Sequence, residues 1–145
     1  MFNFGSCYFY GNGVEQDYKQ AVYWLRKAAE LGDAEAQNRL GYCYDNGNGV
    51  VRNVETAIRW FMKAADQGQA KAEYNLGLHY YKGNGVEKDE RKAVNLVQNA
   101  YFHGFEYAKD WLDKRTEEGW YRNCPYCKYH ADLTATTCPH CGADL

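Results

Sequence analysis

Proline is scarce in this sequence, with two among 145 residues, and no serine-rich stretch or run of one charge sign occurs. Such features are typical of disordered linkers, so their absence argues against a long one. Hydrophobic residues make up 46% of the chain and charged residues 25%, which is the composition of a globular protein. We therefore expect a chain that folds over most of its length.

Long apolar stretches are also missing. The sequence has no run of about 18 apolar residues, which a membrane-spanning helix would need. The first residues, MFNFGSCYFYGNG, lack the basic start and apolar stretch of a signal peptide. The sequence thus predicts a cytoplasmic protein that does not use a membrane as a partner.

An excess of positive charge is absent as well. The formal net charge is −2, and Lys, Arg, Asp and Glu are interleaved along the chain. Proteins that bind nucleic acid usually carry a basic patch or stripe. The charge pattern therefore argues against nucleic acid and favours a protein or peptide partner that is recognised through shape and local contacts.

Motifs of common enzymes are missing too, since neither Ser-x-x-Lys nor Gly-x-Ser-x-Gly occurs. The string Gly-Asn-Gly-Val occurs three times and at first suggests a phosphate-binding loop. It lacks the third glycine of a dinucleotide fingerprint and the Gly-Lys-Ser/Thr of a P-loop. We expect a protein that is not an enzyme.

What the sequence does contain is a repeat. The copies of Gly-Asn-Gly-Val begin at Gly11, Gly47 and Gly83, which are 36 residues apart. The same spacing relates further sets, which are Gly5, Gly41 and Gly77; Tyr8, Tyr44 and Tyr80; and Gly32, Gly68 and Gly104. A constant period in this range predicts a stacked array in which each unit buries its apolar face against its neighbours.

Each unit has the pattern of two helices joined by a tight turn. In the second unit, Ala36 and Leu40 begin a four-residue periodicity that predicts a first helix, and Gly47 ends it. Asn53 is a good N-cap for a second helix, which Gly68 ends. The glycines of the turn are expected to serve backbone geometry rather than a ligand.

The pattern of a unit extends over many positions. In the second unit they are Leu40, Gly41, Tyr44, Gly47, Gly49, Val50, Asn53, Ala57, Trp60, Lys63, Ala64, Ala65 and Gly68. This pattern resembles the Sel1-like repeat, a relative of the tetratricopeptide repeat, over residues 1–118. The resemblance implies an all-α fold, an α/α superhelical solenoid of about three units and a capping helix. It also implies a protein–protein interaction scaffold or adaptor.

One branch of that family offers an alternative function. The cysteine-rich Sel1-like proteins include penicillin-binding hydrolases, whose repeats carry paired cysteines that join the two helices of each unit. The repeats of this chain carry only single cysteines, Cys7 and Cys43, at equivalent positions where the third unit has His79. We interpret both as packed side chains, and the scaffold remains the favoured function.

Four further cysteines lie near the C-terminus. Cys124, Cys127, Cys138 and Cys141 form two Cys-x2-Cys pairs separated by ten residues. Each pair can present two thiolates to one metal, and four thiolates suit Zn²⁺ and leave no open position for water. The sequence predicts a zinc ribbon over residues 119–145 with one structural Zn²⁺. Disulfides or a rubredoxin-like iron site are the alternatives.

The ribbon is expected to be a second contact module. Nucleic-acid binding through it is an alternative function for the chain. Arg122 and Lys128 are balanced by Asp132 and Asp144, which weakens that alternative.

The first helices of the units are expected to line the inner surface of the superhelix. In the second unit, residues 36, 40 and 44 face the second helix, so residues 35, 38, 42 and 45 point the other way. Along the array this stripe predicts the partner-binding residues Asn38, Tyr42, Asp45, Lys71, Tyr74, Leu78, Tyr81 and Tyr107.

The composition of this stripe suits a bound peptide or loop. Tyrosine offers a large contact area with few rotatable bonds, and Asn38 is expected to pair with an extended backbone. The alternative is that several of the tyrosines pack between neighbouring repeats.

The N-terminal unit is incomplete, because Met1 is equivalent to Gln37 and the opening turn of the first helix is absent. Its outward face, with Phe2, Phe4 and Phe9, is expected to be adhesive. It would contact earlier repeats or support self-association.

Overall fold

The computed structural model describes residues 1–117, 121–123, 130–132 and 143. Helices make up the first of these ranges, and no strand interrupts them. Their bounds are α1 Phe2–Tyr10, α2 Tyr18–Glu30, α3 Ala34–Asn46, α4 Val54–Ala65, α5 Ala70–Lys82, α6 Glu90–Phe102 and α7 Tyr107–Glu117. A short antiparallel pair of strands follows, made of β1 Tyr121–Asn123 and β2 His130–Asp132.

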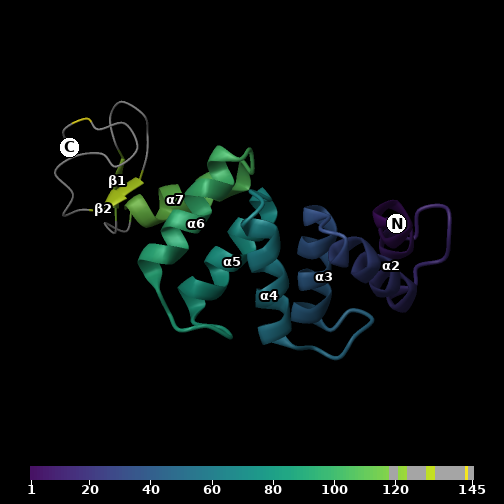
Figure 1. Ribbon diagram of the computed structural model, residues 1–145. Helices are drawn as coiled ribbons and strands as arrows, with labels where there is room; N and C mark the ends of the chain where they lie inside the picture. The colour runs from purple at the N-terminus through teal and green to yellow at the C-terminus, as the bar shows by residue number, and fades with distance from the viewer. Residues whose placement is uncertain (118–120, 124–129, 133–142, 144–145) are drawn as a thin grey trace.

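The helices alternate as first and second helices of a unit. We call α1, α3, α5 and α7 the A helices and α2, α4 and α6 the B helices. Helices α3, α5 and α7 each pack on the B helix of the preceding unit, and α1, α3 and α5 each pack on the B helix of their own unit. The units follow one another in an array with α1 at one end and the β1–β2 pair at the other (Figure 1). The predicted helical solenoid is confirmed.

Each B helix begins at an acceptor side chain. Asp17, Asn53 and Asp89 each accept a hydrogen bond from a backbone N–H in the first turn. These bonds satisfy amides that have no partner inside the helix. The N-cap predicted at Asn53 is confirmed, and Asp33 does the same for α3 by accepting from Ala36 N at 2.8 Å.

The Gly-Asn-Gly-Val segments are the turns between A and B helices. Gly47 closes α3 in the left-handed conformation, with φ of 76°, and its N–H donates to Cys43 O. Gly49 also has a positive φ, and a Cβ built there would lie 2.3 Å from the carbonyl oxygen of Tyr18 in the preceding unit. The predicted backbone role is confirmed, and the second glycine additionally permits close contact between units.

A glycine in the A helix lets the two helices of a unit approach closely. A Cβ on Gly41 would lie 2.8 Å from the ring of Phe61 in α4, and one on Gly77 would lie 2.7 Å from Val97 in α6. The same close contact between the two helices of a unit is therefore present in the second and third units.

The apolar core consists of clusters in series. One joins α2 to α3, the next joins α4 to α5, and the third joins α6 to α7. Each cluster therefore lies between the B helix of one unit and the A helix of the next, as expected when a unit buries its apolar face against its neighbour. Cys43 is fully buried in the first cluster, which confirms its interpretation as a packed side chain.

Helix α7 is a fourth A helix, and no B helix follows it within the residues that the structure describes. Ala108 and Leu112 of α7 are buried against α6. Strand β1 then pairs with β2, and Asn123 is opposite His130. Within the described residues no helix is long and apolar enough to cross a membrane.

The aromatic residues of α1 differ from the prediction. Phe2 and Phe9 are half-buried and pack against the α2/α3 cluster, so they contribute only part of their surface to the N-terminal face. Phe4 does face outward, with 60% of its surface exposed, although its ring lies 5.5 Å from that of Trp24. Its equivalent, Leu40, is fully buried by the preceding unit.

Candidate partner-binding groove

A groove of about 360 Å³ lies on the face formed by the A helices. Its lining residues are Phe9, Tyr10, Glu35, Asn38, Arg39, Tyr42, Lys71, Tyr74, Asn75 and Phe105. They come from α1, α3, α5 and the segment before α7. Phe9 and Tyr10 precede the second unit and Phe105 follows the third unit, yet all of them line the same groove. This face of the array is therefore concave.

An adjoining hollow of about 180 Å³ continues from the groove along α3 and α5. The two share Tyr42 and Asn75. The other residues that line it are Asp45, Asn46, Phe61, Leu78, His79, Lys82 and Asn84. Together they form one continuous surface across the second and third units.

Most of the predicted partner-binding residues lie on this surface. Those in the groove are Asn38, Tyr42, Lys71 and Tyr74, and those in the hollow are Asp45 and Leu78. The stripe drawn from helical periodicity therefore coincides with the concave face over the two central units.

Tyr81 and Tyr107 lie elsewhere. The ring of Tyr81 meets the ring of Trp111 edge-on, with centroids 5.4 Å apart, and Arg115 lies over it at 4.7 Å. Tyr81 thus packs in the seam between α5 and α7, which is the alternative that the sequence left open for these tyrosines. Tyr107 is 75% exposed and lines a different hollow, beside Tyr101.

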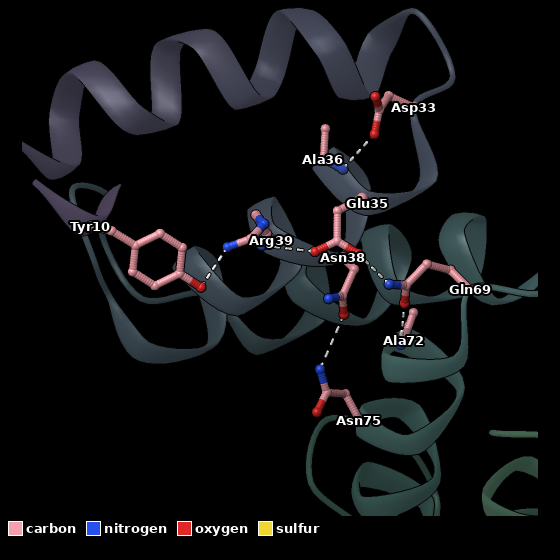
Figure 2. A network of polar contacts seen from close by, with 9 residues as sticks. All are labelled: Tyr10, Asp33, Glu35, Ala36, Asn38, Arg39, Gln69, Ala72 and Asn75. Carbon is pink, nitrogen blue, oxygen red and sulfur yellow. Dashed lines mark hydrogen bonds and ion pairs between the residues drawn. The ribbon is translucent and has the colours of Figure 1, made fainter. Parts of the chain in front are cut away.

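A network of polar contacts crosses the wall of the groove (Figure 2). Arg39 donates to the hydroxyl of Tyr10 at 2.6 Å and pairs with Glu35 at 3.0 Å. Glu35 also accepts from Gln69 Nε2 at 2.6 Å, and Gln69 Oε1 accepts from Ala72 N at 2.7 Å. The network links α1, α3 and α5, so it fixes the relative positions of the helices that shape the groove.

Asn38 takes part in a second contact between units. Its side-chain oxygen Oδ1 accepts from Asn75 Nδ2 at 3.1 Å, and the residue is only 6% exposed (Figure 2). The expectation that Asn38 pairs with an extended backbone is therefore not supported by its placement. Asn75 is half-buried and lies between the groove and the hollow.

Aromatic rings form both ends of the groove. At one end the ring of Phe9 lies 6.1 Å from that of Tyr42, and at the other Tyr74 lies 5.1 Å from Phe105. Burial raises the pKa of Tyr74, while Arg115 opposes the rise. Its hydroxyl therefore stays protonated at neutral pH and can donate a hydrogen bond.

The hollow is built around a buried imidazole. His79 Nδ1 lies 2.9 Å from the carbonyl oxygen of Asn84, and Nε2 lies 3.5 Å from Asp45 Oδ2. The ring also packs against Phe61 with centroids 5.8 Å apart. These contacts hold the turn after α5 against α3 and orient Asp45.

Sequence reasoning missed several groove residues. Arg39 and Asn75 are adjacent in helical angle to the predicted stripe, and a stripe one residue wider would have included both. Tyr10 is the last residue of α1. Phe105 lies outside any helix, so periodicity gives no signal for it.

The fold and the concave groove define this chain as an α/α repeat solenoid. The Sel1 repeat family matches it at residues 1–33, 34–69 and 70–101, so the chain belongs to the Sel1 repeat family. These bounds coincide with the three A–B hairpins α1/α2, α3/α4 and α5/α6.

Solved structures of bacterial proteins are similar. A Sel1 repeat protein from Oxalobacter formigenes is 36% identical with a TM-score of 0.78, over 81% of this chain and 48% of that one. The protective antigen c5321 present in uropathogenic Escherichia coli strains, which displays an SLR fold, is 36% identical with a TM-score of 0.77, over 81% of this chain and 25% of that one.

A third similar structure is cysteine rich protein B of Helicobacter pylori. It is 32% identical with a TM-score of 0.61, over 66% of this chain and 72% of that one. The chain spans less than half the length of the first two structures. No curated protein matches the chain.

Sel1-repeat proteins are generally protein-interaction scaffolds and are typically not enzymes. In the described repeats Cys7 and Cys43 are free, so no disulfide staples a helical hairpin there.

The predicted metal site falls outside the part of the chain that the structure describes. Its ligands are Cys124, Cys127, Cys138 and Cys141. Among the described residues, no group of three or more His, Cys, Asp or Glu side chains could hold a metal ion.

Proposed function

We propose that this protein is an interaction scaffold whose groove and adjoining hollow hold an extended segment or loop of a protein partner. The observation that carries this proposal is the aromatic lining of one concave surface by residues of successive units. Phe9, Tyr10, Tyr42, Tyr74 and Phe105 all line the groove.

The physical character of the surface supports a peptide ligand. The groove volume of about 360 Å³ falls in the range of roughly 300–1,000 Å³ typical of ligand sites. The contacts of Figure 2 hold its walls before any ligand arrives, which lowers the entropy that binding must overcome. Tyrosine side chains combine apolar area with a hydroxyl that can meet a peptide backbone.

The test replaces Tyr42 and Tyr74 together by Ala and compares capture of proteins from a lysate of the source cells. Each tyrosine at a binding centre is worth about 2 kcal/mol, so we expect capture to fall more than tenfold. Tyr23→Ala is the matched control, because Tyr23 is 51% exposed on α2, away from the groove. Capture unchanged in the double variant, with an intact thermal melt, would overturn the proposal.

We also propose that Cys124, Cys127, Cys138 and Cys141 hold one structural Zn²⁺. The Cys-x2-Cys spacing and the thiolate ligand set support it. The β1–β2 pair offers further support, since the pairing of Asn123 with His130 brings together the two ends of the segment that carries the first cysteine pair.

A ribbon of this kind would be a second contact module beside the groove. Four zinc-binding thiolates and free cysteines in the repeats suit a reducing compartment, so the proposal includes a cytoplasmic location.

A further inference from the structure

The acidic and the basic side chains around the groove and the hollow differ in whether they have a partner. Glu35 pairs with Arg39 and accepts a hydrogen bond from Gln69, while Asp45 lies against His79. No other acidic side chain lines these surfaces in the described part of the chain. The negative charge of Glu35 is therefore compensated by Arg39, whereas the neighbour of Asp45 is an imidazole and not a permanent cation.

Two lysines on the same surfaces differ in this respect. Lys71 lines the groove and Lys82 lines the hollow, and both are exposed. Among the described residues neither forms an ion pair. The site thus presents two uncompensated positive charges, although the net charge of the chain is −2.

The spacing of these lysines follows from the helix that carries both. They are eleven residues apart on α5, which places them on nearly the same face and about 16 Å apart along the axis. Tyr42 and Asn75 lie between them, where the groove meets the hollow. An extended chain rises about 3.3 Å per residue and alternates its side chains between two faces, so residues four apart point to the same side at about 13 Å, and the flexible lysine side chains can cover the remaining distance.

We propose, resting on the function proposed above, that the occupant is an acidic extended peptide segment. It carries two Asp or Glu side chains four residues apart, which point to the same side of the extended segment, one toward Lys71 and one toward Lys82. An apolar or aromatic side chain between them packs against Tyr42. The lysines select the charge of the partner and its register, and the aromatic residues supply most of the affinity.

The experiment selects ligands from a displayed library of random peptides long enough to span both lysines. The library is selected on the unmodified chain, on a Lys71→Glu/Lys82→Glu variant and on a Lys19→Glu/Arg59→Glu control. The control changes net charge equally at exposed residues of the B helices, away from the groove. A Tyr42→Ala/Tyr74→Ala variant is selected in parallel.

We expect the unmodified chain and the control to enrich the same peptides, with acidic residues at two positions four apart. The lysine reversal should enrich peptides with Lys or Arg at those positions instead. A synthesised acidic peptide should bind the reversed variant at least tenfold more weakly, and its affinity for the unmodified chain should fall as salt is raised.

The outcomes separate this inference from the proposed function. If the tyrosine variant loses all enrichment while the lysine reversal selects unchanged peptides, the groove binds peptides but not by charge, and this inference fails alone. If the tyrosine variant selects the same peptides as the unmodified chain, or no peptide is enriched on any chain, the groove itself is wrong. Displacement of the peptide by a tighter-binding single-stranded oligonucleotide would also overturn the inference.

Discussion

Single residues at equivalent positions of the second and third units form chemically different pairs. Gln67 Nε2 donates to Gln37 Oε1 at 2.8 Å, and 36 residues further along the chain His103 Nδ1 lies 2.8 Å from Glu73 Oε2. Gln37 and Glu73 are both buried. An amide pair in one seam is thus replaced by an ionisable pair in the next.

Removing one member of the ionisable pair is expected to cost more than replacing both. His103→Ala should lower the free energy of unfolding by about 1–2 kcal/mol, because buried Glu73 loses its partner while half-exposed His103 is screened by solvent. Glu73→Gln with His103→Gln recreates the pair of the second unit and should stay within about 1 kcal/mol of the original. Urea unfolding of both variants measures this, and equal losses would contradict it.

The buried thiol of Cys43 predicts a pH dependence of stability. Burial raises its pKa to about 11 from 9.0, with Arg39 opposing. Above pH 9 the thiol ionises in the unfolded chain but stays protonated in the folded one, so stability falls as pH rises to about 11. The loss attributable to Cys43 should approach about 2 kcal/mol.

Urea unfolding across this pH range measures the loss. Cys43→Ala should remove this part of the decrease, while Cys7→Ala, at the equivalent but half-buried position, should not. Identical pH profiles for the original chain and Cys43→Ala would contradict the assignment.

At the scale of helices and turns, the sequence predicted elements well because their signals are local. Acceptor side chains, terminal glycines and apolar periodicity all act within a few residues of the element they define. The contact of Gly49 with Tyr18 of the preceding unit could not be predicted in this way, since it depends on how units stack. The partial burial of Phe2 and Phe9 could not be predicted for the same reason, because it depends on how α1 packs on the α2/α3 cluster.

The turns therefore contain glycines of unequal importance. Gly13 and Gly49 are equivalent and both have positive φ, but a Cβ on Gly13 meets nothing within 4 Å, whereas one on Gly49 lies 2.3 Å from a backbone oxygen. Gly13→Ala should cost about 1 kcal/mol for its conformation alone. Gly49→Ala should cost about 3 kcal/mol, because the turn must also move away from α2.

Thermal and urea unfolding of the two glycine variants compare these costs directly, with Gly13→Ala as the control for conformation. Equal losses would show that the contact between units adds nothing beyond backbone strain.

At the scale of the whole molecule, the candidate site was predictable where it follows helical periodicity. The central part of the stripe, including Tyr42 and Tyr74, lines the groove because α3 and α5 present the same face of successive units. The stripe failed at Tyr81, because Trp111 and Arg115 of α7 pack on its ring and the sequence does not show which residues the capping helix covers. Phe105 reaches the groove only because the array curves.

The array and the proposed zinc module should be separable. The repeats bury their own clusters from α2 to α7, whereas folding and metal binding are one event in a module as small as a ribbon. The purified, reduced chain should therefore carry one Zn²⁺. A chelator should remove it and expose residues 119–145 to protease, while the helical circular dichroism and its thermal melt change little.

Cys138→Ser should lose the metal without chelator, and Cys7→Ser, in the repeats, should keep it and thus serves as the matched control. Elemental analysis that finds no metal in the reduced protein would refute the zinc site. Loss of helical signal on chelation would instead show that the array depends on the ribbon, through the contact of α7 with β1.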